Sequence, residues 1–119
     1  METQELVKKY GINLKKLEEE QLKLAESLEF NKGVDWQDVA FIGGVESFMI
    51  KNKIVSVIIV CNKEFEIIDQ SYFTDSLRFP YIHGFKSYRE IPSVLGAYKK
   101  LQEKPGLLLI KGEGINHER

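Results

Sequence analysis

Ile54–Cys61 reads IVSVIIVC and is nearly continuous β-branched sequence. A strand that is apolar at consecutive positions has both of its faces covered, which places it inside a sheet rather than at the rim. Polar segments bound this run, since Lys51-Asn52-Lys53 precedes it and Asn62-Lys63 follows it, and both have the composition of turns. We therefore expect Ile54–Cys61 to be a central strand between two turns.

The apolar runs beyond these turns predict the neighbouring strands. Val39–Val45 lies on the N-terminal side and contains Gly43-Gly44. Such glycines in a strand indicate a bulge or the close approach of another backbone. Phe65–Tyr72 lies on the C-terminal side and takes its apolar content from Phe65, Ile67 and Ile68. Three strands joined by tight turns predict an antiparallel meander.

A helix and a last strand follow the meander. We expect the helix to begin at Pro92, because proline favours the first helical position and costs about 3 kcal/mol in a helix interior. Pro105-Gly106 predicts its end, and Leu107–Ile110 then predicts a short buried strand. We expect the buried stripe of this helix to consist of Val94, Leu95, Tyr98 and Leu101.

The first thirty residues have helical periodicity. Glu5–Tyr10 predicts a short helix that Gly11 stops, and Asn13 is placed to cap a second helix over Leu14–Leu28. That helix carries leucines on one stripe, which favours packing onto a sheet. These leucines are Leu14, Leu17, Leu24 and Leu28. Glu29–Trp36 has the composition of a polar linker.

Composition restricts the possible partners. Lys and Arg total 17 against 18 Asp and Glu, so no overall field attracts the chain to polyanions, and nucleic-acid binding needs a local patch. The single cysteine, Cys61, cannot form an intramolecular disulfide. No apolar run reaches the length of a membrane span and the start lacks a signal peptide, so we expect a cytoplasmic protein without a membrane partner.

Phe79–Glu90 reads FPYIHGFKSYRE and is the chain's most unusual loop. Binding residues concentrate on loops, and Tyr81 and Phe85 are placed to stack on bases while neighbouring basic side chains face phosphates. The alternative is that Tyr81, Ile82 and Phe85 pack into the core. The candidate residues for binding single- or double-stranded nucleic acid are Pro80, Tyr81, Ile82, His83, Phe85, Lys86 and Arg89.

Three motifs together resemble the endonuclease V family, whose members are Mg²⁺-dependent nucleases that cut nucleic acid near deaminated purines, especially inosine. The PYIP loop and the R-E pair of the family correspond to Pro80-Tyr81-Ile82-His83 and Arg89-Glu90. The first four positions of the G-V-D-x-S motif correspond to Gly44-Val45-Glu46-Ser47. The D-G-x-G-x-x-H-P-R motif corresponds to residues 111–119, KGEGINHER.

The resemblance implies an α/β, truncated ribonuclease H-like fold. It consists of the three-stranded antiparallel meander, a parallel fourth strand beside the first, and packed helices. We expect one endonuclease V-like domain over residues 1–119, with N-terminal helices in 1–30 and the mixed sheet with its crossover helix in 38–111. The family continues with a fifth strand and more helices, for which this sequence has no counterpart.

The resemblance also identifies a candidate catalytic site made of Glu46, Glu90, Lys111 and Glu113. Glu46 replaces an aspartate, Glu90 corresponds to a metal-holding glutamate, and Lys111 stands where the family has a metal-binding aspartate. We expect Lys111 to pair with Glu46 and Glu90 in place of a metal. The alternatives to a functional role are that Glu46 is an ordinary solvated surface charge, and that Ser87 and Glu90 form a helix cap.

These substitutions favour an endonuclease V-like protein that has lost the metal-dependent cut, needs no cofactor, and retains at most nucleic-acid or partner binding. One alternative is an active Mg²⁺-dependent endonuclease in which Glu46 and Glu90 bind the metal and Glu113 assists. Another is a non-catalytic homodimer of structural or interaction function. An unpaired edge at Leu107–Ile110 would be apolar, and two such edges can pair about a two-fold axis.

Overall fold

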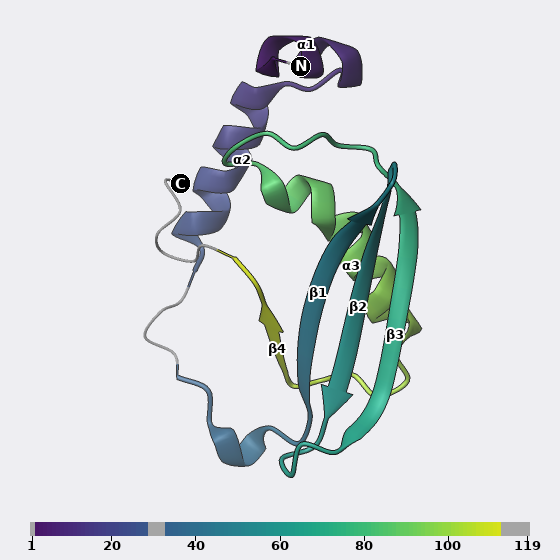
Figure 1. The fold of residues 1–119 in the computed structure, drawn as a ribbon. Helices are drawn as coiled ribbons and strands as arrows, with labels where there is room; N and C mark the ends of the chain where they lie inside the picture. Colours follow the sequence, from purple (N-terminus) through teal and green to yellow (C-terminus); the bar gives the residue numbers. More distant parts are fainter. Residues whose placement is uncertain (1, 29–32, 113–119) are drawn as a thin grey trace.

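The computed structural model describes residues 2–28 and 33–112, which contain a four-stranded sheet with a helix on one face (Figure 1). The strands are β1 (Ile42–Ile50), β2 (Lys53–Cys61), β3 (Ile67–Ser76) and β4 (Leu107–Ile110), in the spatial order β3-β2-β1-β4. β2 is antiparallel to both of its neighbours, and β4 is parallel to β1. The predicted meander with a parallel fourth strand is confirmed.

The helices are α1 (Thr3–Tyr10), α2 (Leu14–Glu26), the 3₁₀ helix η1 (Trp36–Asp38) and α3 (Lys86–Lys100). α1 ends as predicted at Gly11, whose φ of 63° is left-handed. The Asn13 side chain accepts a hydrogen bond from the Lys16 amide and caps α2 as predicted. None of the helices in the described ranges has both the length and the apolar content needed to cross a membrane.

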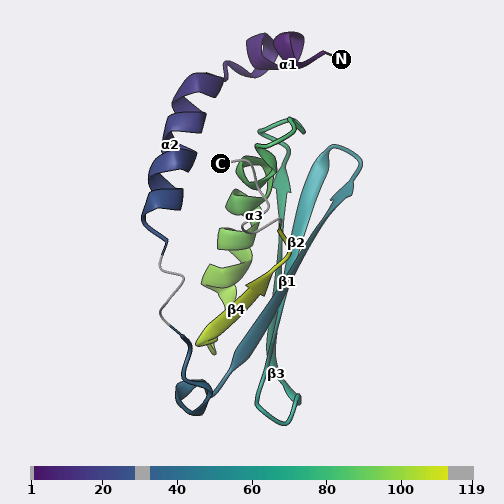
Figure 2. The same cartoon turned by 90° about the vertical axis from the view of Figure 1, so that its left-hand side faces the viewer.

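α3 lies along one face of the sheet, as Figure 2 shows from the side, and the core lies between the two. Ile58 and Val60 of β2 have no exposed surface and pack with Ala97 of α3 and with Leu101, the residue that follows the helix. Ile59 points to the opposite face of the sheet and is 42% exposed, because no described helix lies there. β2 is therefore an interior strand as predicted, but the prediction that both of its faces are covered is wrong.

Two glycines set how closely the elements approach. A Cβ atom on Gly96 of α3 would lie 2.5 Å from the Phe73 ring, so only glycine lets the helix sit this close to β3. At Gly43, a Cβ atom would lie 2.8 Å from Leu108 of β4 and 2.9 Å from Pro105. The close approach predicted in the first strand thus involves side chains, and the β1–β2 register runs without a bulge at that point.

α3 begins at Lys86, six residues before the predicted start at Pro92. Pro92 lies inside the helix, where it removes one backbone hydrogen bond. The early turns are held by aromatic packing, since the Tyr88 ring lies 5.8 Å from Phe79 and 6.4 Å from Phe85. Tertiary packing has overridden the local preference of proline.

The strand boundaries also differ from the prediction. β1 continues to Ile50, so Glu46 lies in the middle of the strand rather than at its end. Phe65 belongs to the turn before β3, with a φ of 61° and 73% of its surface exposed. The Asn62 side chain accepts hydrogen bonds from the Glu64 and Glu66 amides, and this longer turn delays the start of β3.

α2 packs through a different set of residues from the predicted leucine stripe. Leu24 and Leu28 are 59% and 60% exposed, so the prediction of a buried stripe is wrong for them. Gln21 instead donates to the Gly84 carbonyl oxygen at 2.8 Å, and the Tyr88 hydroxyl lies 3.3 Å from the Leu17 carbonyl oxygen. Polar contacts place α2 against the loop that precedes α3.

Asp69 of β3 stabilises the turn that follows α3 through hydrogen bonds. Its carboxylate accepts hydrogen bonds from the backbone amides of Gln102 and Glu103, and the Glu103 bond holds the pKa of Asp69 below its ordinary value. A lowered folded-state pKa adds stability above the unfolded-state value, and this stability is lost as the pH falls through the folded-state value. We expect Asp69→Ala to lower Tm by a few degrees at pH 7.

The pH dependence identifies the cause of that loss. The difference in Tm between wild type and Asp69→Ala should shrink below the ordinary aspartate pKa of about 3.9. Asp38→Ala, at an exposed aspartate of η1, is the control. Thermal unfolding followed by circular dichroism at several pH values measures the effect. A difference in Tm that stays constant down to pH 2 would contradict it.

Candidate functional site

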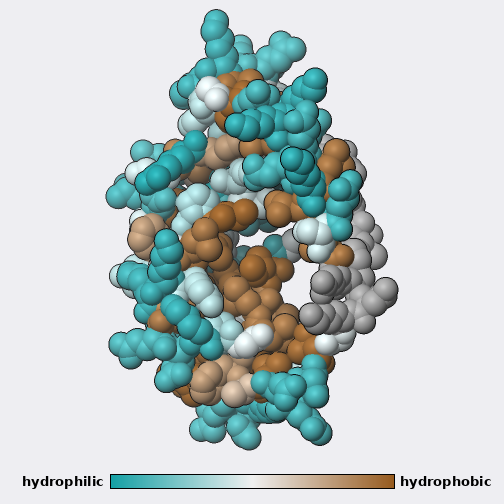
Figure 3. Space-filling view, turned by 180° about the vertical axis from the view of Figure 1, so that it is seen from behind, coloured by the Kyte–Doolittle hydropathy of each residue, from teal (hydrophilic) through white to brown (hydrophobic). Residues whose placement is uncertain are grey.

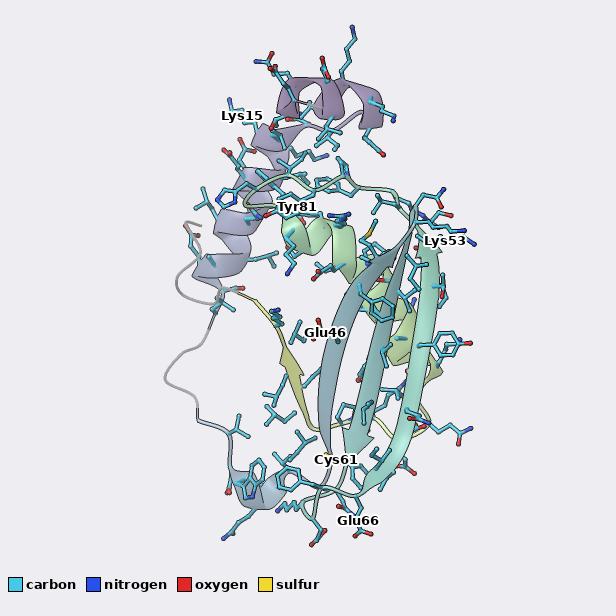
Figure 4. The ribbon with its side chains drawn as sticks, in the orientation of Figure 1. Lys15, Glu46, Lys53, Cys61, Glu66 and Tyr81 are labelled. Atoms are coloured by element: carbon cyan, nitrogen blue, oxygen red, sulfur yellow. The ribbon has the colours of Figure 1, made fainter. Side chains whose placement is uncertain are left out.

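The parallel pairing of β1 and β4 places Glu46 and Lys111 at the same level of the sheet. Val45 pairs with Ile110, and Glu46 and Lys111 are the next residues on the two chain segments. β4 ends at Ile110. Glu46 lies on β1 on the side of β4, as Figure 4 shows.

Glu90 approaches the same place from α3, where it lies in the second turn of the helix. Glu46, Glu90 and Lys111 line one cavity of about 180 Å³. The remaining lining residues are Val45, Ser47, Lys86 and Ile110. The structure therefore brings together three of the four residues predicted for the catalytic site, and Glu113 lies outside the described residues.

The cavity contains two ammonium groups as well as two carboxylates. Lys86 Nζ lies 3.6 Å from Glu90 Oε1, in an i,i+4 pair whose side chains are 52% and 21% exposed. Between described residues, no ion pair joins Lys111 to Glu46 or Glu90. The prediction that Lys111 pairs with both carboxylates is thus wrong, because Lys86 is the partner of Glu90.

This donor set does not fit a magnesium site. Mg²⁺ prefers carboxylate and water oxygens in octahedral geometry. Residues 2–28 and 33–112 contain no group of three His, Cys, Asp or Glu side chains placed to hold a metal ion. The two carboxylates of the cavity are balanced by Lys86 and Lys111, so the residues described provide no excess negative charge for a divalent cation.

A chain of three serine hydroxyls runs beside the cavity. The Ser47 and Ser56 oxygens are 2.6 Å apart, as are those of Ser56 and Ser93, and Ser93 donates to the Glu90 carbonyl oxygen. Each hydroxyl has one proton, so Ser56 donates to Ser93 and Ser47 donates to Ser56. The chain links β1, β2 and the turn of α3 that carries Glu90.

Sequence reasoning missed this hydroxyl chain and the role of Lys86 beside Glu90. A signal for the chain was available, since Ser56 is the one polar residue inside IVSVIIVC and has no exposed surface. A buried hydroxyl in an apolar strand needs a hydrogen-bond partner. The sequence did not indicate which residues would supply it.

The loop before α3 is divided between the core and the surface. Pro80, Ile82 and Phe85 are buried, with Ile82 5% and Phe85 4% exposed, whereas Tyr81 and His83 are exposed. The prediction that Phe85 stacks on a base is wrong, because its ring packs beneath the loop. For Ile82 and Phe85, the core alternative is the one observed.

Arg89 contacts the exposed aromatic residue of this loop. Its guanidinium carbon lies 5.9 Å from the centroid of the Tyr81 ring, within the range of a cation–π interaction. Its Nε atom is buried and has no hydrogen-bond partner among the described residues. The alternative helix cap by Ser87 is wrong, since Phe85 is the N-cap residue and α3 has no side-chain cap.

An antiparallel meander, a crossover helix and a parallel fourth strand beside the first define the ribonuclease H-like class of folds. Carboxylates from the first strand and the crossover helix meet in one cavity here. The family model described as Endonuclease V matches residues 21–119. The chain belongs to the endonuclease V family.

Two curated relatives give the extent of the match. Endonuclease V of Dictyoglomus turgidum is 39% identical over 104 residues, which cover 85% of this chain and 46% of that protein. Endonuclease V of Dictyoglomus thermophilum is 39% identical over 85 residues, which cover 71% of this chain and 37% of that protein. The chain thus spans less than half the length of either relative.

Solved structures agree on the fold. Endonuclease V of Streptomyces avermitilis matches with a TM-score of 0.82 and 22% identity, covering 89% of this chain and 48% of its own. Endonuclease V of Ciona intestinalis, in complex with a DNA 24mer that contains an inosine followed by a ribo-adenosine, matches with a TM-score of 0.75 and 19% identity. That match covers 88% of this chain and 48% of the other.

Proposed function

We propose that this chain is an endonuclease V-like protein that binds nucleic acid and does not hydrolyse it. One observation carries the proposal: Lys111 lines the same cavity as Glu46 and Glu90. Family members that cut use a metal ion, and this chain has a resident cation at the corresponding position.

Electrostatic repulsion by Lys111 explains the loss of hydrolysis. At an effective dielectric constant of about 20, a unit positive charge about 6 Å from a divalent ion repels it by about 5.5 kcal/mol. Glu46 and Lys111 are exposed, so screening lowers this value. Lys86 adds a second ammonium group at the same cavity, and a metal ion would have to displace it from Glu90.

The surface beside the cavity supports nucleic-acid binding. Tyr81 is 55% exposed and backed by the Arg89 guanidinium, and the exposed His83 and Lys86 follow it in the sequence. An exposed ring next to basic groups is suited to stacking on a base while cations contact phosphates. The Ciona intestinalis relative binds inosine-containing DNA, and we extend nucleic-acid binding from that protein to this one.

A cleavage assay tests the loss of hydrolysis. Labelled single and double strands that contain one inosine are incubated with the chain in Mg²⁺ or Mn²⁺, and we expect no product. The competing proposal is an active enzyme in which Glu46 and Glu90 bind Mg²⁺. Cleavage that disappears in Glu90→Ala would establish that enzyme and contradict our proposal.

Nucleic-acid binding depends on Tyr81 in our proposal. Loss of base–aromatic stacking costs about 1–3 kcal/mol, so Tyr81→Ala should weaken binding of a labelled strand about 5- to 150-fold. Fluorescence anisotropy measures the effect. Tyr72→Ala is the matched control, because Tyr72 is 62% exposed on β3, away from the loop. Equal affinities for the two variants would contradict a binding role for Tyr81.

A homodimer through the edge of β4 stays a prediction. The exposure of Leu109 and Ile110, at 60% and 58%, supports it. Light scattering coupled to gel filtration tests it directly. A mass that stays monomeric at high protein concentration would contradict it.

A further inference from the structure

Phe48 is an exposed aromatic residue of β1, two residues before the strand ends at Ile50. The G-V-D-x-S motif of the family has a serine at this position, so the ring is a departure that belongs to this chain. The side chain is 45% exposed. Aromatic side chains dominate the energetics of interfaces, and an exposed ring beside a candidate binding loop is therefore a candidate contact with the ligand.

The short length of β4 explains why this ring is open. Parallel pairing joins Ile42–Val45 of β1 to Leu107–Ile110 of β4, and no described strand pairs with the outer edge of β1 beyond Val45. Side chains two residues apart on a strand point to the same face of the sheet, so Phe48 lies beside Glu46. A ligand that reaches the free edge of β1 near Glu46 also reaches the Phe48 ring.

Phe48 and Tyr81 line the same small cavity, which has a volume of about 60 Å³. Arg89 lines it as well, with its guanidinium carbon 5.9 Å from the centroid of the Tyr81 ring. This cavity adjoins the candidate site through three residues that line both cavities, which are Ser47, Lys86 and Glu90. Two exposed aromatic rings thus lie next to each other beside the candidate site.

Basic side chains gather at this end of the molecule. They are Lys51, Lys53, Lys86 and Arg89. Figure 4 shows Lys53 and Tyr81 at the same end, above Glu46. The four basic groups outnumber the two carboxylates beside them, those of Glu46 and Glu90. In a chain whose net charge is -1, this is the local patch that binding to a phosphate backbone requires.

The groove on the other side of Tyr81 does not suit a charged strand. It lies between α3 and β4 and has a volume of about 700 Å³, and Figure 3 shows the hollow from behind with an apolar wall. Aliphatic side chains provide most of this wall, among them Ile91, Leu95 and Leu108. Burying phosphates against such a wall is costly. The path of a bound strand therefore leads from Tyr81 towards Phe48.

We propose that Tyr81 and Phe48 stack on two bases of one strand, and that the chain therefore prefers single-stranded nucleic acid to duplex. This preference rests on the nucleic-acid binding proposed above. A base leaves its duplex before a protein ring covers its face, and the lost pairing and stacking weaken duplex binding. Because every base has a π-face, stacking tolerates any sequence, and the preference concerns strandedness rather than base identity.

Fluorescence anisotropy with a labelled DNA strand of mixed sequence, and with the blunt duplex of the same strand, measures the preference. The single strand should bind at least about tenfold more tightly than the duplex, because it needs no unpairing. Phe48→Ser introduces the serine of the family motif and should weaken single-strand binding about 5- to 150-fold, the range for loss of one base–aromatic stack. Phe48→Tyr keeps a ring and should bind like wild type.

A matched variant and a second probe isolate stacking. Phe65→Ser removes a ring that is 73% exposed in the β2–β3 turn, at the opposite end of the sheet, and should leave both affinities unchanged. An abasic strand of the same length carries the phosphates without the bases. Wild type and Phe48→Ser should bind it equally, and wild type should bind it more weakly than the strand with bases.

Three results overturn this inference. Equal affinity of wild type for single strand and duplex contradicts the preference, and wild type that binds the abasic strand as tightly as the complete strand contradicts stacking. Single-strand binding that Phe48→Ser leaves intact removes Phe48 from the site. If Tyr81→Ala still weakens binding in that case, the proposed nucleic-acid binding stands without Phe48. Wild type that binds none of the probes removes both proposals.

Discussion

Lys111→Asp should give the cavity an affinity for Mn²⁺ at least about tenfold above that of wild type, equivalent to about 1.4 kcal/mol. The change removes an ammonium group and adds a carboxylate to the cavity that already contains Glu46 and Glu90. Three carboxylates from β1, α3 and the end of β4 then face one space, which suits a hard divalent cation. The electron paramagnetic resonance signal of free Mn²⁺, titrated with protein, measures the bound fraction.

A second lysine separates the local effect from the change in net charge. Lys15→Asp makes the same substitution on an exposed position of α2, far from Glu46 in Figure 4, and should leave Mn²⁺ binding at the wild-type level. Glu46→Gln in the Lys111→Asp background should return it to that level. Wild-type protein that binds Mn²⁺ as tightly as Lys111→Asp would remove the argument against hydrolysis.

The sheet was predictable because its signals are local. The β-branched run of β2 and the polar turns on either side of it determine an antiparallel meander. The position of Lys111 beside Glu46 followed from the resemblance and from the parallel pairing of the first and last strands. The same reasoning missed Lys86 as the partner of Glu90, because an i,i+4 pair forms only if the helix begins before residue 87.

The errors occurred where long-range packing competes with local preference. Pro92 favoured a late start for α3, but the packing of Tyr88 between Phe79 and Phe85 stabilises the earlier turns. Phe85 looked like a surface aromatic residue because its neighbours are polar, and its burial depends on contacts that no local pattern contains. Leu24, Leu28 and Leu95 are errors of another kind. Their helical spacing predicts burial, and yet each is at least half exposed, because the described residues do not cover them.

Ile58→Ala should be the most destabilising single truncation in the sheet. Ile58 has no exposed surface and packs in the cluster of Val45, Val60, Ala97 and Leu101. Removing a fully buried isoleucine side chain costs about 2–5 kcal/mol, because the lost burial adds to the cost of the cavity left behind. That loss is a large part of the 5–15 kcal/mol by which a typical domain is stable.

The next residue of β2 provides the matched control. Ile59 has the same side chain in the same strand but points to the open face of the sheet, where it is 42% exposed. Ile59→Ala should therefore cost less than half as much as Ile58→Ala in urea unfolding at equal protein concentration. Equal losses of unfolding free energy in the two variants would contradict the exposure of Ile59 on an uncovered face of the sheet. A loss at Ile59 that grows with protein concentration would show that another polypeptide covers this face in solution, because association stabilises the folded form by mass action.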